Sequence, residues 1–152
     1  MERRKILWLT SWYPNKYDAF NGDFIQRHAR AAAINDDIHV LFITKSPVHE
    51  TNENFQYATG LTEQIIYFKE YQSYLGKFQN QISYVTHYRN AIKNYIQKNG
   101  LPHCVHVHIP WKAGLVALWM KKVYKKDFIY HSYLLLASHP FSVACPVTFF
   151  LI

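Results

Sequence analysis

The sequence predicts an α/β fold with a doubly wound, mostly parallel, Rossmann-like sheet. Short apolar runs alternate with segments of helical spacing, which is typical of parallel strands joined by helices. The run at 38–44 (IHVLFIT) is apolar on both faces after His39, as expected of a strand covered by helices on each side. Residues 5–32 also combine a strand, a long loop and a helix start, as in nucleotide-binding layers.

The first predicted elements are a strand, a loop and a helix. The strand is the apolar run at 6–9 (ILWL), and the loop after it reaches Gly22. At about ten residues the loop exceeds the usual 2–6 of such connections, so it is a candidate for function. Asp23 is the predicted cap of the helix, with Gln26 as its capping-box partner. The residues at 35–37 (NDD) end the helix.

The middle of the chain contains the clearest helix. Residues 46–60 have no clear period and are interpreted as an exposed excursion, whereas 65–68 (IIYF) indicate a strand. Apolar positions then recur at three- and four-residue steps between residues 74 and 99. These positions are Phe78, Ile82, Val85, Tyr88, Ile92, Tyr95 and Ile96. Gly100 and Pro102 supply the expected stop.

A strand, a helix and a further strand follow. Residues 103–109 (HCVHVHI) alternate between two faces, which predicts a strand, and Pro110 stands at the natural first position of a helix. Residues 128–130 (FIY) begin the next strand. Apart from a single loop excursion, strands and helices therefore alternate along the chain, and this order predicts one mostly parallel sheet.

The charge and the cysteine content limit the function classes. The chain of 152 residues carries 17 Lys and Arg against 10 Asp and Glu, a net charge of +7. This balance suits nucleic acid, anionic lipid headgroups or a phosphorylated ligand. Two cysteines are too few for a disulfide framework, and the apolar run after Arg3 and Arg4 is too short for a signal peptide. We expect a cytoplasmic protein, or one peripheral at the inner membrane face.

The final 25 residues differ sharply in composition from the rest. Residues 128–152 contain no Asp, Glu, Lys or Arg. A membrane-spanning helix would fit the length, but His131, His139, Pro140 and Pro146 interrupt the segment. We therefore divide the chain into a domain at 1–127 and an apolar tail at 128–152, and expect a chain that is truncated or frame-altered after about residue 127.

Two segments resemble the amino-terminal half of bacterial family 4 glycosyltransferases, which have the two-domain GT-B fold. They are KILWLTSWYPN…NGDFIQRHARAA at the start and VHVHIPWKAGLVAL later, covering residues 5–44 and 101–127. The resemblance implies transfer of a hexose from a nucleotide sugar to a glycan or lipid-linked acceptor, with retention of configuration and without a cofactor or bound metal. The usual setting is the synthesis of polysaccharides, capsules or lipid-linked glycans.

The loop tip and the helix after it supply three candidate substrate-binding residues. Asn21 and Gly22 form the tip, where glycine permits a positive φ and close backbone approach, and free helix amides favour a phosphate. Arg27 lies one turn into the helix and could donate two hydrogen bonds to a phosphate. The alternative is a turn glycine with a helix cap, and an arginine that only contacts solvent.

His108 is the fourth candidate substrate-binding residue. It lies at the carboxyl end of its strand, where crevice residues belong, and the resemblance places this position beside the interdomain cleft. His106 is interpreted as a packed core residue. Cys104, His106 and His108 share one strand face, but simple alternation explains the pattern, and no metal site is predicted. His131 lacks the threonine of the Thr-x-His motif found in resembling enzymes, so we assign no catalytic residue.

The donor-binding half of a GT-B enzyme has no counterpart in this sequence. The five glycines are scattered and form no phosphate-binding motif. We therefore expect an acceptor-side domain of a hexosyltransferase with little or no activity alone, and leave open whether the chain itself is an enzyme. The alternative is a noncatalytic basic membrane-surface or interaction module, which would use the aromatic-rich region at 67–88. Nucleic acid is not an expected partner, because the basic residues form no compact stripe.

Overall fold

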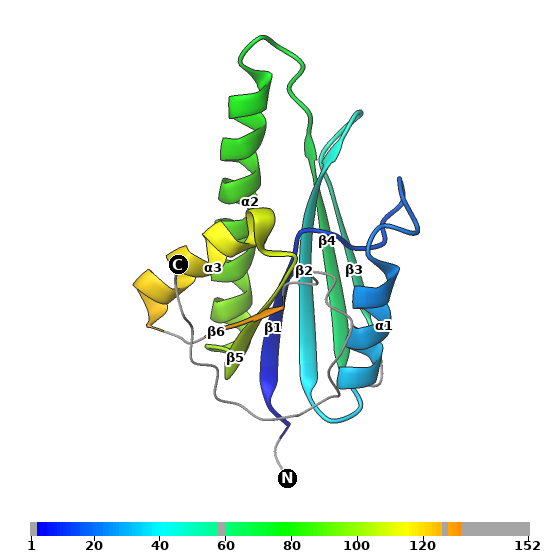
Figure 1. The fold of residues 1–152 in the computed structure, drawn as a ribbon, viewed down its shortest axis with the longest axis vertical. Helices are drawn as coiled ribbons and strands as arrows, with labels where there is room; N and C mark the ends of the chain where they lie inside the picture. The colour runs from blue at the N-terminus through cyan, green and yellow to red at the C-terminus, as the bar shows by residue number, and fades with distance from the viewer. Residues whose placement is uncertain (1–2, 58–59, 126–127, 132–152) are drawn as a thin grey trace, which may run out of the picture.

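The computed structural model describes residues 3–57, 60–125 and 128–131. Within them, six strands form one sheet in the order β3-β4-β2-β1-β5-β6, shown in Figure 1. The strands are β1 (Lys5–Thr10), β2 (Asp37–Ser46), β3 (Thr51–Gln56), β4 (Leu61–Lys69), β5 (Cys104–His108) and β6 (Phe128–His131). The helices in these residues are α1 (Asp23–Ala32), α2 (Gly76–Asn99) and α3 (Pro110–Tyr124). The predicted α/β class and the predicted order of these elements are confirmed, with β3 as an addition.

The sheet is parallel except at one edge. β1 pairs with β2 and β5, β2 pairs with β4, and β5 pairs with β6, all in parallel, whereas β3 runs antiparallel to β4. The interpretation of 46–60 as an excursion without a strand was wrong. The sequence of β3 (TNENFQ) is polar and mostly exposed, because an edge strand can be held by its ladder to β4 without a buried apolar face.

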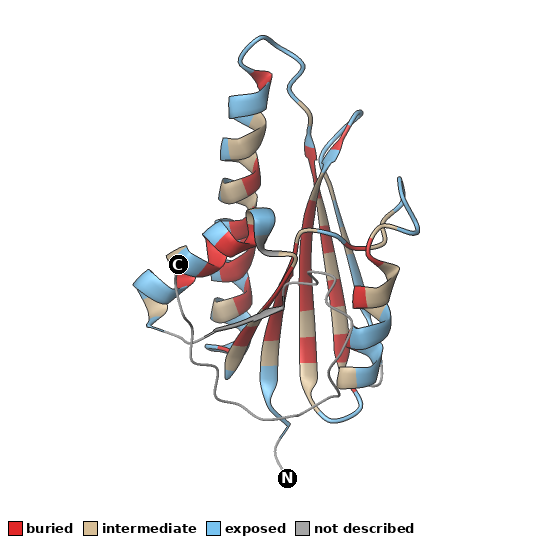
Figure 2. Ribbon diagram, in the orientation of Figure 1, coloured by how far each residue is buried: buried red, intermediate tan, exposed pale blue. Residues whose placement is uncertain are grey.

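Helices cover both faces of the sheet, and each face has its own core (Figures 1 and 2). α1 packs on one face, where Ile25 and Ala29 contact strand residues such as Trp8 and Val40. α2 and α3 pack on the other face. The buried residues there include Leu7, Leu9, Leu41, Ile43, Tyr88, Ile92, Val105, Val107, Val116 and Met120. Alternate residues of the central strands thus enter opposite cores, as expected for strands buried on both faces.

The start of α1 differs from the predicted capping box. Gly22 occupies the N-cap with φ 68°, no side chain caps the helix, and Asp23 is the first helical residue. The Gln26 side chain does not turn back to the cap. Its amide donates to both carboxylate oxygens of Glu63 on β4, each at 3.1 Å. A buried carboxylate that needs donors thus recruits the glutamine that the local motif would have used.

The apolar positions of α2 are more exposed near the start of the helix than further along. Phe78 and Ile82 follow the helical spacing that predicts a core face, yet they are 68% and 51% exposed. Tyr84 and Tyr88, further along the helix, are buried. Figure 2 shows the same change from exposed to buried along α2. The periodicity therefore predicted the helix correctly, but part of its apolar stripe lies where no strand of the described sheet reaches it.

No helix within the described residues is long and apolar enough to cross a membrane. The first four residues of the predicted tail form β6, which pairs with β5 in register from Val105 opposite Phe128 to His108 opposite His131. The remainder of the tail, 132–152, lies outside the described residues. Residues 128–131 therefore belong to the same sheet as the preceding domain.

Candidate ligand pocket at the carboxyl edge of the sheet

The chain changes direction in the sheet between β1 and β5. From β1 it passes through α1 on one face to β2, whereas from β5 it passes through α3 on the other face to β6. In open α/β sheets, such a switch leaves a crevice outside the carboxyl ends of the strands, and ligands bind there. The topology therefore predicts a ligand site at the carboxyl ends of β1 and β5.

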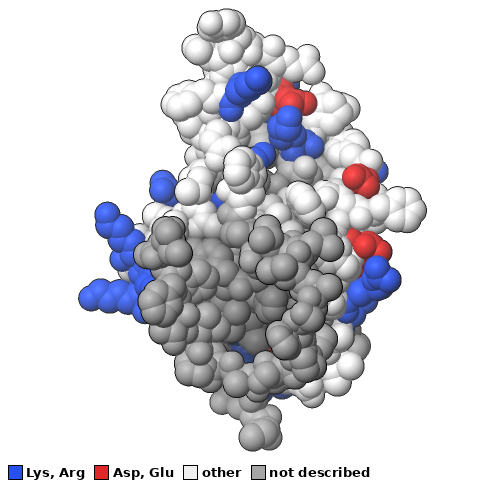
Figure 3. All heavy atoms as spheres, in the orientation of Figure 1, with Lys and Arg blue, Asp and Glu red and all other residues white. Residues whose placement is uncertain are grey.

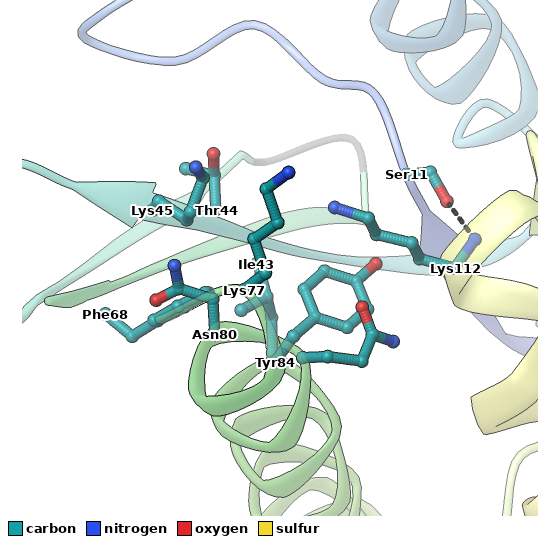
Figure 4. Close-up of a pocket in the computed structure, with 10 residues that line it drawn as sticks. Ser11, Ile43, Thr44, Lys45, Phe68, Lys77, Asn80, Tyr84 and Lys112 are labelled. Carbon is teal, nitrogen blue, oxygen red and sulfur yellow. Dashed lines mark hydrogen bonds between the residues drawn. The ribbon is translucent and has the colours of Figure 1, made fainter. Parts of the chain in front are cut away.

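A pocket of about 260 Å³ lies at this edge, on the side of α2 and α3 (Figure 4). It is formed by the carboxyl ends of β1, β2 and β4, the first half of α2 and the start of α3. The lining residues are Ser11, Ile43, Thr44, Lys45, Phe68, Lys77, Asn80, Gln81, Tyr84 and Lys112. Its volume is slightly below the roughly 300–1,000 Å³ typical of pockets for drug-sized ligands, so it suits a small group.

Ser11 fixes the position of α3 relative to the end of β1. Its backbone N–H donates to the carbonyl oxygen of His108 at 3.2 Å. Its hydroxyl oxygen accepts from the backbone N–H groups of Lys112 at 3.4 Å and Ala113 at 3.2 Å (Figure 4). The serine thus satisfies amides of the first turn of α3 from a different part of the chain. As a result, β1, β5 and the start of α3 hold one wall of the pocket together.

The end of β1 is also tied to α2. The buried Tyr88 hydroxyl donates to the carbonyl oxygen of Thr10 at 2.6 Å and contacts that of Leu41 at 3.2 Å. Asn80 holds the segment before α2, because its side chain accepts from the backbone N–H of Tyr71 and donates to the carbonyl oxygen of the same residue. These bonds position the helix wall of the pocket against the strand ends.

The pocket carries uncompensated positive charge. Lys45 forms an ion pair with Glu70, but Lys77 and Lys112 form none with any described residue. None of the ten described lining residues is acidic. In Figure 4 the ammonium groups of Lys77 and Lys112 extend toward the same side of the pocket, from α2 and α3. In Figure 3 several other basic side chains gather along the left edge of the described surface, and the acidic ones lie apart from them.

Tyr84 places an unused hydroxyl at the pocket wall. The residue is 5% exposed, and its hydroxyl makes no hydrogen bond of ordinary geometry to a described residue, although Ser11 and Tyr88 lie close. Burial raises the pKa of Tyr84 to about 12, so the group stays a neutral donor at physiological pH. The Nζ atom of Lys112 lies 5.5 Å from the centroid of its ring. A buried hydroxyl without a partner is costly, and a ligand in this pocket would supply one.

The raised pKa of Tyr84 predicts a dependence of stability on alkaline pH. Above pH 10 the unfolded chain releases the tyrosine proton while the folded chain retains it, so rising pH favours unfolding. Urea unfolding should show that wild type loses about 1.4 kcal/mol more than Tyr84→Phe between pH 8 and pH 11. The same loss in both proteins would show that Tyr84 titrates normally. At pH 8 Tyr84→Phe should be at least as stable as wild type, because the substitution removes a buried hydroxyl that has no partner among the described residues.

The candidate residues of the first loop lie on the α1 side of the sheet, away from this pocket. Gly22 is buried, and a Cβ there would lie 2.9 Å from the backbone carbonyl carbon and oxygen of Trp12. Asn21 is half-buried beside it. The Arg27 guanidinium pairs with the Asp23 carboxylate at 2.9 Å on the exposed side of α1. Ligand contact by these three residues stays a prediction.

His108 lies in a buried aromatic stack at the end of β5. It is 1% exposed, and its ring centroid lies 4.2 Å from that of Trp8 and 4.1 Å from that of His106. Its side chain does not line the pocket described above, and its role in substrate contact remains a prediction.

No group of three or more His, Cys, Asp or Glu residues within the described part of the chain could hold a metal ion.

Sequence reasoning missed Ser11, Lys77, Tyr84 and Lys112. The rule that ligands meet strand carboxyl ends could have found Ser11, which directly follows β1. Lys112 could also have been inferred, because it stands in the first turn of a helix after a candidate strand. Lys77 and Tyr84 carry no local signal, since only the packing of α2 across the strand ends brings them to this edge.

Comparison with known proteins does not identify the chain. No model of a known protein family matches it, and no curated protein matches it either.

Proposed function

We propose that this chain is the acceptor-side domain of a GT-B-type retaining glycosyltransferase, which holds a glycan or lipid-linked acceptor while a hexose arrives from a nucleotide sugar. The observation that carries the proposal is the pocket at the carboxyl edge, at a topological switch point. The resemblance of residues 5–44 and 101–127 to family 4 enzymes supports the same reading.

The lining of the pocket supports binding more than chemistry. Gln81, Thr44 and Tyr84 offer amide and hydroxyl groups, which suit the hydroxyls of a sugar. None of the described lining residues is a carboxylate that could act as a general base. The proposed domain therefore contributes by positioning the acceptor. Holding an acceptor at attack distance from a donor can account for about 7–11 kcal/mol of a barrier, and this requires a second, donor-binding wall.

A binding experiment tests this proposal. We would titrate the ¹⁵N-labelled chain with a panel of neutral and phosphorylated monosaccharide and disaccharide compounds and follow the backbone amides. A binding acceptor should shift the amides of Ser11, Thr44 and Lys112 and leave that of Asn52 on β3 unchanged. Gln81→Ala should weaken this binding about three- to tenfold through a lost hydrogen bond. Gln97→Ala, an exposed glutamine on the same helix, is the matched control.

Three outcomes would contradict the proposal. The first is the absence of any shift at the pocket amides across the whole panel. The second is measurable hexose transfer from a nucleotide sugar by the purified chain alone, since the proposed domain provides one wall of the cleft. Equal weakening by Gln81→Ala and Gln97→Ala would also count against binding in this pocket.

One observation favours a second candidate, a noncatalytic membrane-surface module. The start of α2 and the segment before it expose Tyr74, Leu75, Phe78 and Ile82, with Lys77 among them. Apolar side chains beside a cation suit an anionic lipid surface. Tyr67, Phe68, Tyr84 and Tyr88 of the same aromatic-rich region are buried and would not take part. Sedimentation with anionic vesicles that weakens as salt rises, together with loss on Phe78→Ser, would support this candidate over the first.

A further inference from the structure

We propose that the pocket at the carboxyl edge binds a phosphate group, and that the acceptor is therefore a phosphate-bearing molecule. The second half of this statement rests on the proposed function, whereas the phosphate site itself follows from the lining of the pocket. Three features of the pocket favour a phosphate, namely its charge, the geometry of its donors and its size.

The charge of the pocket favours an anion. Lys77 and Lys112 come from two different helices and reach the same pocket without an ion pair to any described residue. Lys45 is already compensated by Glu70. Like charges that share one pocket repel each other, and an anion bound beside both ammonium groups would offset this repulsion.

The donors suit a phosphate better than a carboxylate. Lysine binds phosphate as a point charge, whereas planar carboxylates are recognised best by the fork of an arginine, and no arginine lines this pocket. The Tyr84 hydroxyl adds a third donor, which is buried and without a hydrogen-bond partner among the described residues. Donors on α2 and α3 thus approach from separate directions, as the several oxygens of a phosphate require.

The size limits what can accompany the phosphate. At about 260 Å³, the pocket suits a phosphate or diphosphate and an adjoining small group. Phe68 and Ile43 form its apolar floor, so the polar contacts come from the helices and from the strand ends. The remainder of a longer acceptor would lie outside the pocket.

Calorimetric titration of the full 152-residue chain tests the site. The probes are sodium pyrophosphate, glucose 1-phosphate and, as the uncharged counterpart, glucose. Lys77→Gln and Lys112→Gln should each weaken pyrophosphate binding about tenfold, because each removes a charge-assisted hydrogen bond. Tyr84→Phe should weaken it about threefold at unchanged net charge. Binding to wild type should also weaken as salt rises.

Matched controls separate the site from general surface charge. Lys93→Gln removes an exposed lysine from α2 and Lys122→Gln one from α3, both outside the pocket lining. Neither should change pyrophosphate binding more than twofold. Equal weakening by pocket and control variants would overturn the site, and so would equal binding of glucose and glucose 1-phosphate. Thermal unfolding of each variant establishes that the chain remains folded.

Two further measurements identify the source of the phosphate and separate a failure of the phosphate site from a failure of the proposed function. Vesicles with and without phosphatidic acid test a lipid phosphate. Sedimentation with the vesicles that contain phosphatidic acid, if it depends on Lys77 and Lys112, supports a lipid source. Binding to these vesicles with no binding of soluble pyrophosphate would overturn the phosphate site in the pocket and indicate a general surface effect. Pyrophosphate binding without binding of any saccharide compound would contradict the proposed function and leave the phosphate site intact. Binding of neutral glycosides alone would do the reverse.

Discussion

Replacement of Glu63 by alanine is expected to lower the free energy of unfolding by about 2–4 kcal/mol. Glu63 is 1% exposed on β4, yet it is a carboxylate. It accepts from the Tyr13 hydroxyl at 2.8 Å and from the Gln26 amide at 3.1 Å. Removing the acceptor leaves a buried hydroxyl and a half-buried amide without partners, and each such group costs about 1–3 kcal/mol. Urea unfolding at pH 7 measures the loss.

The matched control for Glu63 is Glu53 on the edge strand β3. Its side chain is 30% exposed and accepts from the Tyr67 hydroxyl at 2.9 Å. Glu53→Ala should cost about 1 kcal/mol, because water can replace this acceptor. Glu63→Gln keeps an oxygen for Tyr13 and should lose less than Glu63→Ala. Similar decreases in the free energy of unfolding for Glu53→Ala and Glu63→Ala would contradict the view that Glu63 is the central acceptor of a buried hydrogen-bond network.

Replacement of Gly22 by alanine is expected to cost about 2–4 kcal/mol. The residue has φ 68°, a left-handed conformation that costs an L side chain about 1–2 kcal/mol. The added Cβ would lie 2.9 Å from backbone atoms of Trp12, which cannot rotate away as a flexible side chain could. Thermal or urea unfolding measures the effect. The change would also displace the loop from the start of α1, because Gly22 is the N-cap.

Gly100 provides a case of backbone strain alone. It has φ 78° and ψ −178°, a combination that only glycine adopts readily, but a Cβ there meets no atom within 4 Å. Gly100→Ala should therefore lower the free energy of unfolding by about 1–3 kcal/mol through strain without a steric contact. Unchanged stability in Gly100→Ala would show that the backbone relaxes there. Retained stability in Gly22→Ala would show that the loop can move, and would favour a role in ligand contact over a structural one.

The order and boundaries of most elements could be predicted from the sequence. Buried parallel strands must be apolar on both faces, so the runs that became β1 and β2 were visible, and alternation made β5 visible. Pro110 and Gly100 bounded two helices through their own backbone preferences. These are local rules, and they apply whatever the chain does elsewhere.

The predictions that failed all depended on contacts between residues far apart in the sequence. β3 is defined by its ladder to β4 and has no apolar alternation of its own. The Gln26 side chain does not form the capping box, because it donates to the buried carboxylate of Glu63, 37 residues away in sequence. The candidate site was only partly visible for the same reason. Gly22 could be identified as a special backbone position, but the pocket formed by Ser11, Tyr84 and Lys112 depends on how α2 and α3 cross the strand ends.

The antiparallel strand β3 has a consequence for how molecules of this protein meet in concentrated solution. Without it, the nine residues of β4 would offer a long row of unpaired backbone groups to another molecule. β3 covers that row with a shorter strand that is mostly polar and exposed. Glu53 on this strand lies 3.9 Å from the ammonium group of Lys16, so the edge also carries charge of both signs. Such an edge disfavours strand-to-strand polymerisation, and the hairpin of β3 and β4 therefore protects the solubility of the sheet.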